Sequence, residues 1–310
     1  MELTEIKNLA YTKVEINPRQ RINWKSQRLA YLFLLPALVL FGLICWYPIF
    51  QTIMYSFQEV NLSGFKGWVG LDNYRRMFGN PIFYTVWQNT LSYILLSIAM
   101  GSMVPIALAL MINEMRRLSA FFQTLVYLPV LIPVVVGLIV WRQIYAPEGG
   151  ILNGLLQLVG IPPQLWLQNP ALAKPAIVVI MTWMGAGGTV LIYLSGLREI
   201  PLELYEAAEL DGFSVLKRIW FITLPHISAR IKIMLVLQII FVAQVFTEPF
   251  ILTAGGPANS TRSPVLEIYD TAFNQNNFGL ASAWSVSMLV VLSIFSILYV
   301  LLQKKRPGEV

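Results

Sequence analysis

Six long apolar segments, separated by polar stretches, organise the chain. They cover roughly residues 29–50, 90–112, 120–141, 175–194, 231–252 and 280–302. A helix needs about 20 mostly apolar residues to cross the hydrocarbon core of a bilayer. The pattern therefore predicts an all-α polytopic membrane protein with six transmembrane helices. Glycines interrupt the fourth segment, and Gln238, Gln244 and Glu248 interrupt the fifth.

The composition supports a membrane protein. Hydrophobic residues make up 56% of the 310 residues and charged residues 12%, whereas about 25% of the residues of a soluble globular protein are charged. The first segment is too long for a secretory signal and no A-x-A cleavage site follows it, so it is expected to remain as a span. Cys45 and His226 are the single residues of their kinds. No disulfide framework and no protein-held metal site is expected.

The lysines and arginines predict the orientation. With both termini inside, only six of the 22 fall on the outer side, namely Lys66, Arg75, Arg76, Arg142, Lys174 and Arg262. Cytoplasmic loops carry the excess of positive charge. The prediction is therefore a cytoplasmic N-terminal tail (1–28), a transmembrane domain (29–302) and a cytoplasmic C-terminal tail (303–310). The polar loop at about 197–226 is then cytoplasmic as well.

This inner loop is predicted to form a helix, a glycine turn and a second short helix. Pro201 suits a first helical position, since its missing N–H would be unpaired there. Gly212 supplies the left-handed residue that ends helices, and Ser214 can cap the next one. Pro225 predicts a break before the fifth span. An exposed small-residue face would let another surface approach closely, and a solvated amphipathic loop is the alternative.

The loop resembles the EAA loop of ABC importer permeases. The matching residues are Glu206, Ala207, Ala208, Asp211, Gly212, Ile222, Leu224 and Pro225. Permeases of this family usually have alanine after the glycine, where this chain has Phe213. In the family the loop is a coupling helix that docks on a nucleotide-binding subunit. The resemblance implies that Glu206 takes a polar or ionic partner there, while the two alanines and Gly212 allow close packing.

Further stretches resemble the carbohydrate-uptake branch of these permeases. They are NTLSY at 89–93, LPVLIP at 128–133, GGILNGLL at 149–156, LTAGGP at 252–257 and FGLASA at 278–283. The segment at 67–78 resembles the sugar-site-bearing member of the maltose-type permease pair, without its extra N-terminal spans or its large periplasmic insertion. The resemblance covers roughly 29–302 and implies a type I ABC importer permease fold in a bacterial plasma (inner) membrane.

The resemblance also implies partners. These are a second homologous permease subunit, a dimer of ATPase subunits and an extracellular sugar-binding protein, with no role for nucleic acid. The chain has no GxxxxGK[ST] phosphate loop. It is therefore expected to bind no cofactor of its own, to leave ATP and Mg²⁺ to the partner ATPase, and to catalyse no reaction.

The fifth span carries a polar–aromatic stripe. At 100° per residue, Gln238, Phe241, Val245 and Glu248 share one helical face, and Gln244 lies at its edge. Amides and a ring suit the hydroxyls and the apolar face of a sugar. The alternative for Gln238 is a hydrogen bond to a neighbouring helix. For Glu248, near the outer end, a gating or structural role is an equal alternative to substrate contact.

Ungapped spacing from the EAA motif extends the implied substrate path. The implied positions are Gln238, Phe241, Val242, Val245, Met184, Gly185, Gly188, Val130 and Val134. Only Gln238 is polar, so the implied cavity is apolar and leaves selection mainly to the external binding protein. The absence of Lys and Arg at mid-depth argues against a strongly anionic substrate.

Three features keep two interpretations each. The glycine-rich run at 183–188 predicts either an unwound helix at a transport site or close helix packing. Pro129 and Pro133 either kink the third span at a gate or are tolerated there. The outer loop at 253–264 either touches the binding protein or is a plain surface turn.

Competing functions are an ion-coupled secondary transporter, an ABC permease for a non-sugar solute such as a glycerol phosphate derivative, and a membrane-embedded enzyme. A secondary transporter predicts internal repeats and a paired intramembrane acid or base, but no convincing repeat is seen and only Glu248 is acidic within a span. An enzyme predicts a Ser/His pair, a His cluster or an acid pair at membrane depth, and the sequence has none.

Overall fold

The computed structural model describes residues 24–115 and 117–304. The chain forms two compact units, Met1–Gln51 and Thr52–Val310, with the boundary inside helix α3. The described part of the first unit is one helical run. It comprises α2 (Trp24–Phe41), the π-helical turn η1 (Gly42–Trp46) and the start of α3 (Tyr47–Tyr55). The predicted tails at 1–28 and 303–310 lie largely outside the described residues.

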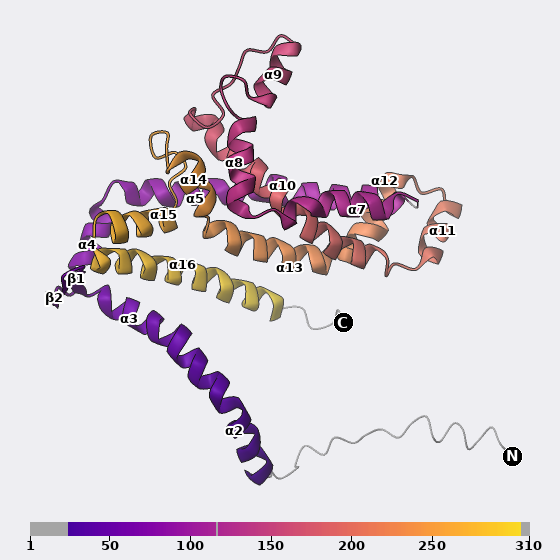
Figure 1. Ribbon diagram of the computed structural model, residues 1–310. Helices are drawn as coiled ribbons and strands as arrows, with labels where there is room; N and C mark the ends of the chain where they lie inside the picture. The colour runs from indigo at the N-terminus through magenta and orange to yellow at the C-terminus, as the bar shows by residue number, and fades with distance from the viewer. Residues whose placement is uncertain (1–23, 116, 305–310) are drawn as a thin grey trace. The chain divides into compact units, whose positions relative to one another are not determined.

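The second unit is built from helices and one β-hairpin (Figure 1). Its elements are β1 (Gln58–Asn61), β2 (Gly64–Trp68), α4 (Asp72–Gly79), α5 (Ile82–Ser97), η2 (Ile98–Ser102), α6 (Met103–Glu114), α7 (Ser119–Tyr127), η3 (Leu128–Leu131), α8 (Val134–Ile144), α9 (Ile151–Leu158), α10 (Pro170–Leu197), α11 (Leu202–Leu210), α12 (Val215–Arg218), η4 (Ile219–Thr223), α13 (Leu224–Ala243), α14 (Thr247–Thr253), α15 (Pro264–Tyr269), η5 (Asp270–Asn274) and α16 (Phe278–Lys304).

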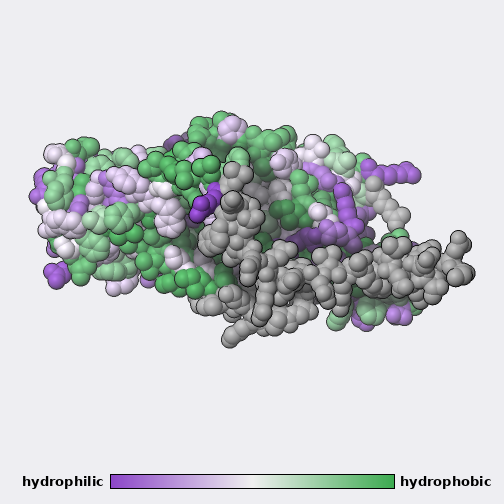
Figure 2. Space-filling view, turned by 90° about the horizontal axis from the view of Figure 1, so that it is seen from below, coloured by the Kyte–Doolittle hydropathy of each residue, from purple (hydrophilic) through white to green (hydrophobic). Residues whose placement is uncertain are grey.

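The helices agree with the predicted membrane class. Among the described residues, five helices are long and apolar enough to cross a membrane, and a bent pair makes a sixth span if counted as one. The five are Tyr31–Tyr55, Ile82–Glu114, Pro170–Leu197, Val215–Ala243 and Phe278–Ile297. Hydrophobic side chains spread over the face in Figure 2, as expected of helices that contact lipid. The sequence had not indicated the hairpin.

The third predicted span, 120–141, is not one straight helix. Its two halves, Ser119–Leu131 and Val134–Ile144, meet at 100°. The break lies at Ile132, whose ψ is 128°, directly before Pro133. Proline disfavours the helical conformation of the residue before it. The structure therefore shows a bend at Pro133, whereas Pro129 lies inside the turn η3.

The fifth span also differs from the prediction. Pro225 does not break it, because α12, η4 and α13 form a continuous run from Val215 to Ala243 and Pro225 sits in the first turn of α13. The run ends at Ala243 rather than near residue 252. A continuous helix would need an N–H from Pro249 to pair the Val245 carbonyl, which proline cannot supply. The chain instead restarts as α14, with Pro249 in its first turn.

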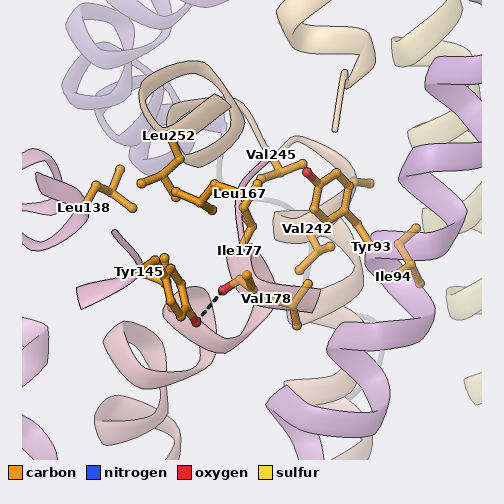
Figure 3. Close-up of a cluster of buried hydrophobic side chains, with 13 residues drawn as sticks. Tyr93, Ile94, Leu138, Tyr145, Leu167, Ile177, Val178, Val242, Val245 and Leu252 are labelled. Carbon is orange, nitrogen blue, oxygen red and sulfur yellow. Dashed lines mark hydrogen bonds between the residues drawn. The ribbon is translucent and has the colours of Figure 1, made fainter. Parts of the chain in front are cut away.

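Three buried clusters hold the second unit together. One, shown in Figure 3, joins α5, α8, α10, α13 and α14 through side chains such as Tyr93, Ile177 and Val242. In it the Tyr145 hydroxyl donates to the Ala176 carbonyl over 3.2 Å. A second cluster packs α6, α10 and α13 around Tyr193. The third packs α4, α5 and α16 around Trp284. These contacts fix α10 and α13 relative to α5.

The two ends of the second unit differ in structure. The hairpin β1–β2 and α4 lie at one end and α11 and α12 at the other (Figure 1). At the hairpin end, Asn73 Nδ2 donates to the carbonyls of Ser56 and Gln58 over 3.0 and 2.9 Å. The hairpin is thereby tied to α4.

Candidate functional site

A cavity of about 500 Å³ lies between α10, α13 and the π turn η2, which joins α5 to α6. None of the described residues that line it is charged. Five of the residues predicted for the substrate path are on its wall: Gln238, Phe241, Val242, Gln244 and Gly185. Most of the wall is apolar, and its polar groups are carboxamides and hydroxyls. The arrangement can take a neutral solute and offers no counter-ion to a charged one.

The other predicted path residues are not on this wall. Val245 is 3% exposed and belongs to the central buried cluster. Glu248 is on α14, beyond the end of α13. The prediction that both share a face with Gln238 was wrong, because it assumed one unbroken helix. Val134 is exposed at the start of α8.

The glycine-rich run is helical, because α10 is continuous across it. Gly187 faces α7: a Cβ there would come within 2.5 Å of the Val126 carbonyl oxygen and 2.8 Å of Tyr127 Cα. This supports close packing over unwinding. A Cβ on Gly188, by contrast, would meet open space.

The two remaining path candidates also pack against glycines. A Cβ on Gly187 would come within 3.0 Å of the Val130 side chain, and a Cβ on Gly137 within 2.8 Å of the end of Met184. Val130 and Met184 therefore fill space at the contacts of α10 with η3 and α8.

Gln238 is held by a neighbouring helix, as the alternative interpretation proposed. Its Nε2 donates to the Ser97 carbonyl over 2.6 Å, and its Oε1 accepts from the Ser102 hydroxyl over 2.8 Å. Both ends of the amide are therefore used by the protein, although the side chain lines the cavity. The sequence showed the polar residue in the span but not these partners.

The sequence analysis missed two cavity residues, Thr182 and Thr189. Both line the cavity from α10 together with Gly185. Their spacing, three and then four residues, places them on one helical face. That spacing was the signal in the sequence. Within the described part of the chain neither hydroxyl has a hydrogen-bond partner, whereas the hydroxyl of Ser97, also on the wall, donates to the Ile94 carbonyl.

The predicted coupling loop has the expected local structure. Helix α11 ends at Leu210 and Gly212 follows with φ +75°. The N–H of Phe213 donates to the Ala208 carbonyl over 2.8 Å, and that of Gly212 to the Glu209 carbonyl over 3.0 Å. This pair of bonds is the Schellman motif, which glycine favours because the position is left-handed. The chain then turns into α12.

Side-chain contacts brace α11 against the rest of the unit. The hydroxyls of Tyr205 and Thr223 lie 2.9 Å apart and join α11 to η4. Arg218 donates to Glu209 over 3.2 Å, which joins α12 to α11. These contacts make α11 and the start of the α12–α13 run one structural element.

A second ion pair supports the root of α11. Arg230 Nη2 lies 2.7 and 2.6 Å from the two carboxylate oxygens of Glu199, between α10 and α11. The Arg230 side chain passes over Gly196, where a Cβ would come within 2.8 Å of it. The end of α10 is thereby tied to α13.

The predicted coupling residues divide into two groups. Glu206, Ala207, Asp211, Gly212 and Pro225 are exposed. Glu206 has no hydrogen bond or ion pair to any described residue, so its carboxylate is free for a partner. Around them lie exposed apolar side chains, Leu210 at 90% and others at 60–65%, namely Leu202, Val215, Leu216 and Trp220.

Ala208 and Phe213 belong to the chain's own fold. Ala208 is 6% exposed, so the expectation that it faces a partner was wrong: its side chain is already covered. The Phe213 ring lies 6.3 Å from that of Phe221 and 5.8 Å from the Lys217 ammonium. Leu224 is half-buried.

At the opposite end, the loop at 253–264 is anchored by α5. Asn89 Nδ2 donates to the carbonyls of Asn259 and Arg262 over 2.7 and 3.0 Å. The Tyr93 hydroxyl donates to the Thr261 carbonyl over 3.2 Å. The stretch NTLSY, which carried part of the sequence resemblance, is thus in direct contact with the loop that follows LTAGGP. Hydrogen bonds from α5 therefore hold the loop in place.

A cluster of charged side chains lies next to this loop. Arg262 bridges Glu267 over 2.6 Å and Asp270 over 2.5 Å. Burial works to raise the pKa of the Asp270 carboxyl, but hydrogen bonds from Asn274 and Arg262 outweigh it and lower that pKa below its ordinary value of 3.8. Asp270 is therefore ionised at neutral pH and pairs with Arg262, which belongs to the loop at 253–264.

Comparisons with known proteins show the family of the chain. Residues 101–306 match the family described as "Binding-protein-dependent transport system inner membrane component". The probable ABC transporter permease protein YurN of Bacillus subtilis (strain 168) is 34% identical over 279 residues, 88% of this chain and 95% of that protein. The trehalose/maltose transport system permease protein MalF of Thermococcus litoralis is 30% identical over 284 residues, 91% of this chain and 96% of that protein.

A solved structure is similar along nearly the whole chain. It is a chain of a bacterial alginate ABC transporter in complex with alginate pentasaccharide-bound periplasmic protein. The TM-score is 0.79 with 27% sequence identity, over 89% of this chain and 93% of that chain.

Proposed function

The chain belongs to the family of inner membrane components of binding-protein-dependent transport systems, and we propose that it carries a sugar or oligosaccharide in an ATP-driven importer. It is a multi-pass permease subunit of the ABC type. It moves its solute without breaking a bond in it. The finer assignments below concern the coupling element, the cavity and the partners.

One observation carries the proposal: the coupling element and the cavity wall are joined by one helix. The run Val215–Ala243 begins beside α11 and ends with Gln238, Phe241 and Val242 on the cavity wall. The Tyr205–Thr223 contact fastens α11 to it. A force on α11 therefore reaches the cavity through a rigid element, as switching by rigid-body motion requires.

The exposed face of α11 is proposed to dock on a partner ATPase. Glu206 supplies a free carboxylate, while Ala207 and Gly212 let the partner backbone approach. ATP and Mg²⁺ are bound by that partner. Closure of the ATPase dimer would swing α11 and open the cavity outward, and hydrolysis would reverse this. The end with α11 is accordingly the cytoplasmic end, which agrees with the excess of lysine and arginine predicted for that side.

The cavity is proposed to be half of the translocation path. Phe241 on its wall is 68% exposed in this chain, and a second homologous permease would cover it. An extracellular sugar-binding protein would deliver the solute at the hairpin end. The uncharged wall favours a neutral sugar, and it disfavours a glycerol phosphate derivative, which would need a cation to pair with.

The test is ATPase coupling in the assembled transporter. Glu206→Lys reverses the free charge on the docking face, and Gly212→Pro removes the left-handed turn. Each is expected to abolish most of the stimulation of ATP hydrolysis by the loaded binding protein, without loss of the permease from the membrane. Glu203→Lys is the control, since Glu203 is an exposed acid on the same helix outside the EAA motif. Full stimulation in both test variants would refute the docking role.

A further inference from the structure

The polar groups around the cavity fall into two classes. The amide of Gln238 is bound at both ends by Ser97 and Ser102. A carbonyl oxygen can only accept a hydrogen bond, so the Ser97 carbonyl fixes which end of the amide faces it. The hydroxyls of Thr182 and Thr189 have no partner among the described residues. A ligand in the cavity therefore meets the free threonine hydroxyls, the engaged amide of Gln238, and the amide of Gln244, whose Nε2 donates to the Ile240 carbonyl over 3.0 Å.

The backbone around Gln238 is shaped to admit its amide. Gly101 lies in the π turn η2, and a Cβ on it would overlap Gln238 Nε2. Any other residue at position 101 would therefore push the amide away from the Ser97 carbonyl. A π turn interrupts the regular ladder of helical hydrogen bonds, and such turns are frequent at functional sites. Here the Gln238 side chain of α13 packs against the π turn at Gly101.

The contact joins two spans that are far apart in sequence. Ser97 and Gln238 are 141 residues apart. One lies in the span Ile82–Glu114, where α5 gives way to α6, and the other in the run that starts at the coupling element. These hydrogen bonds thus hold α13 against the π turn η2 of the neighbouring span. This is a clasp between spans, defined by Gln238, Ser97, Gly101 and Ser102.

The two threonines line the cavity from α10, whereas Gln238 lines it from α13. Thr182 and Thr189 lie on α10 with Gly185 between them on the same face, and a Cβ on Gly185 would meet open space. A hydroxyl both donates and accepts, so two of them, about 10 Å apart along the helix, can bind well-separated hydroxyls of an extended polyhydroxy ligand. Both residues are half-buried and their hydroxyls are not among the buried unpartnered atoms of the described chain, so they remain accessible to a ligand in the cavity.

We propose that Gln238 is a positioning residue that clasps α13 to η2, and that Thr182 and Thr189 are the specificity-determining contacts for a neutral polyhydroxy ligand. The ligand class rests on the proposed function, whereas the clasp does not. The assignment reverses the sequence-based expectation that Gln238 is the polar sugar contact.

The clasp is tested by a double-mutant cycle on the full chain in lipid nanodiscs, read as the thermal midpoint of unfolding. Gly101→Ala and Gln238→Leu are each expected to lower the midpoint, and the double variant no further than the worse single one. If Gly101→Ala does not fold, Ser102→Ala takes its place in the cycle. Gly185→Ala, which adds the same methyl to the wall without touching Gln238, is expected to keep the midpoint. Additive effects of the two variants, or equal behaviour of Gly101→Ala and Gly185→Ala, would overturn the clasp.

The ligand contacts are tested with maltotetraose as the probe. Its binding is measured by saturation-transfer NMR on the assembled transporter in nanodiscs without binding protein. Thr182→Val and Thr189→Val keep the side-chain shape and are each expected to weaken binding about three- to tenfold, the loss of one hydrogen bond, at an unchanged midpoint. Thr124→Val is the control, since that exposed hydroxyl bonds its own helix at Ala120.

The outcomes separate the two parts. Unchanged binding in both threonine variants, with Gln238→Leu weakening binding at an unchanged midpoint, would make Gln238 the ligand contact and overturn the proposal. Absence of binding in the wild type would overturn the sugar assignment and the threonine contacts with it. In that case the cycle on Gly101 and Gln238 still decides the clasp.

Discussion

The hydroxyls of Tyr205 and Thr223 lie 2.9 Å apart and join the exposed helix α11 to the helical run that forms the cavity wall. Thr223 is 4% exposed and also donates to the Arg218 carbonyl. The contact is therefore largely shielded from water, and the second hydrogen bond fixes the orientation of the Thr223 hydroxyl. It ties α11 to the run that continues into α13, as the proposed coupling role requires.

Loss of this contact is expected to uncouple the transporter partly. Tyr205→Phe removes one hydrogen bond, worth about 1 kcal/mol, and leaves the ring in place. The number of solute molecules moved per ATP should fall while the permease still assembles, measured as uptake and phosphate release in the same proteoliposomes. Tyr84→Phe is the control, because Tyr84 is exposed and no hydrogen bond of its hydroxyl is found in the described part of the chain. An unchanged ratio in Tyr205→Phe would contradict the bracing role.

The two alanines of the motif are expected to respond differently to enlargement. Ala208 is 6% exposed, so Ala208→Leu overpacks its site and should destabilise the chain by about 1–3 kcal/mol. Ala207 is exposed, so Ala207→Leu should leave the thermal midpoint unchanged and instead reduce co-purification of the ATPase. The midpoint of the isolated chain and pull-down of the ATPase measure the two effects. Equal midpoints would show that Ala208 is not covered.

Neighbouring glycines in α10 provide a test of helix packing. Gly187→Ala places a Cβ against the backbone of Val126 and Tyr127, which should lower stability by about 1–3 kcal/mol. Gly188→Ala meets open space, and alanine is favoured over glycine within a helix by about 1 kcal/mol. Its midpoint should stay equal or rise. Thermal unfolding of both variants in nanodiscs decides, and a loss of the same size in both would contradict the contact with α7.

Acid is expected to release the charged cluster at the hairpin end. The pKa of Asp270 is lowered in the folded chain, so its contribution is present above the ordinary value of 3.8 and is lost as pH falls through the lower, folded-state pKa. Wild type should be more stable than Asp270→Asn near neutral pH, and the two should converge as pH falls below the lowered, folded-state pKa of Asp270. Midpoints across this range measure the effect. A constant difference at all pH values would show that Asp270 does not titrate as described.

The coupling element was predictable because its signals are local. Gly212 follows the end of α11 with the expected positive φ, whereas Pro201 is the N-cap of α11 rather than its first helical residue, and Ser214 is the N-cap of α12 without a side-chain capping hydrogen bond. The third and fifth spans were less predictable. Apolar composition marks a membrane segment but not its straightness, and the effects of Pro133 and Pro249 depend on whether the chain bends or restarts.

The substrate path shows the same division. Gln238 and Phe241 were placed on the substrate path from helical spacing and Val242 from the family resemblance, and all three line the cavity. Val245 and Glu248 were misplaced by the helix end at Ala243. Thr182 and Thr189 were missed, because a threonine in an apolar helix commonly bonds its own backbone, and only the packed structure shows that these two do not.

By itself the sequence determined the membrane class, the helical architecture and the glycine turn of the loop at 197–226, since hydrophobic length and turn residues act over short stretches of chain. The tertiary structure alone decided which polar groups are engaged and which are free. Ser97 and Gln238 are 141 residues apart, and only folding brings the amide to the carbonyl. The same holds for Ala208, whose small size suits a partner and whose burial belongs to this chain. Whether a side chain is satisfied within the chain or offered to another molecule depends on neighbours that are distant in sequence.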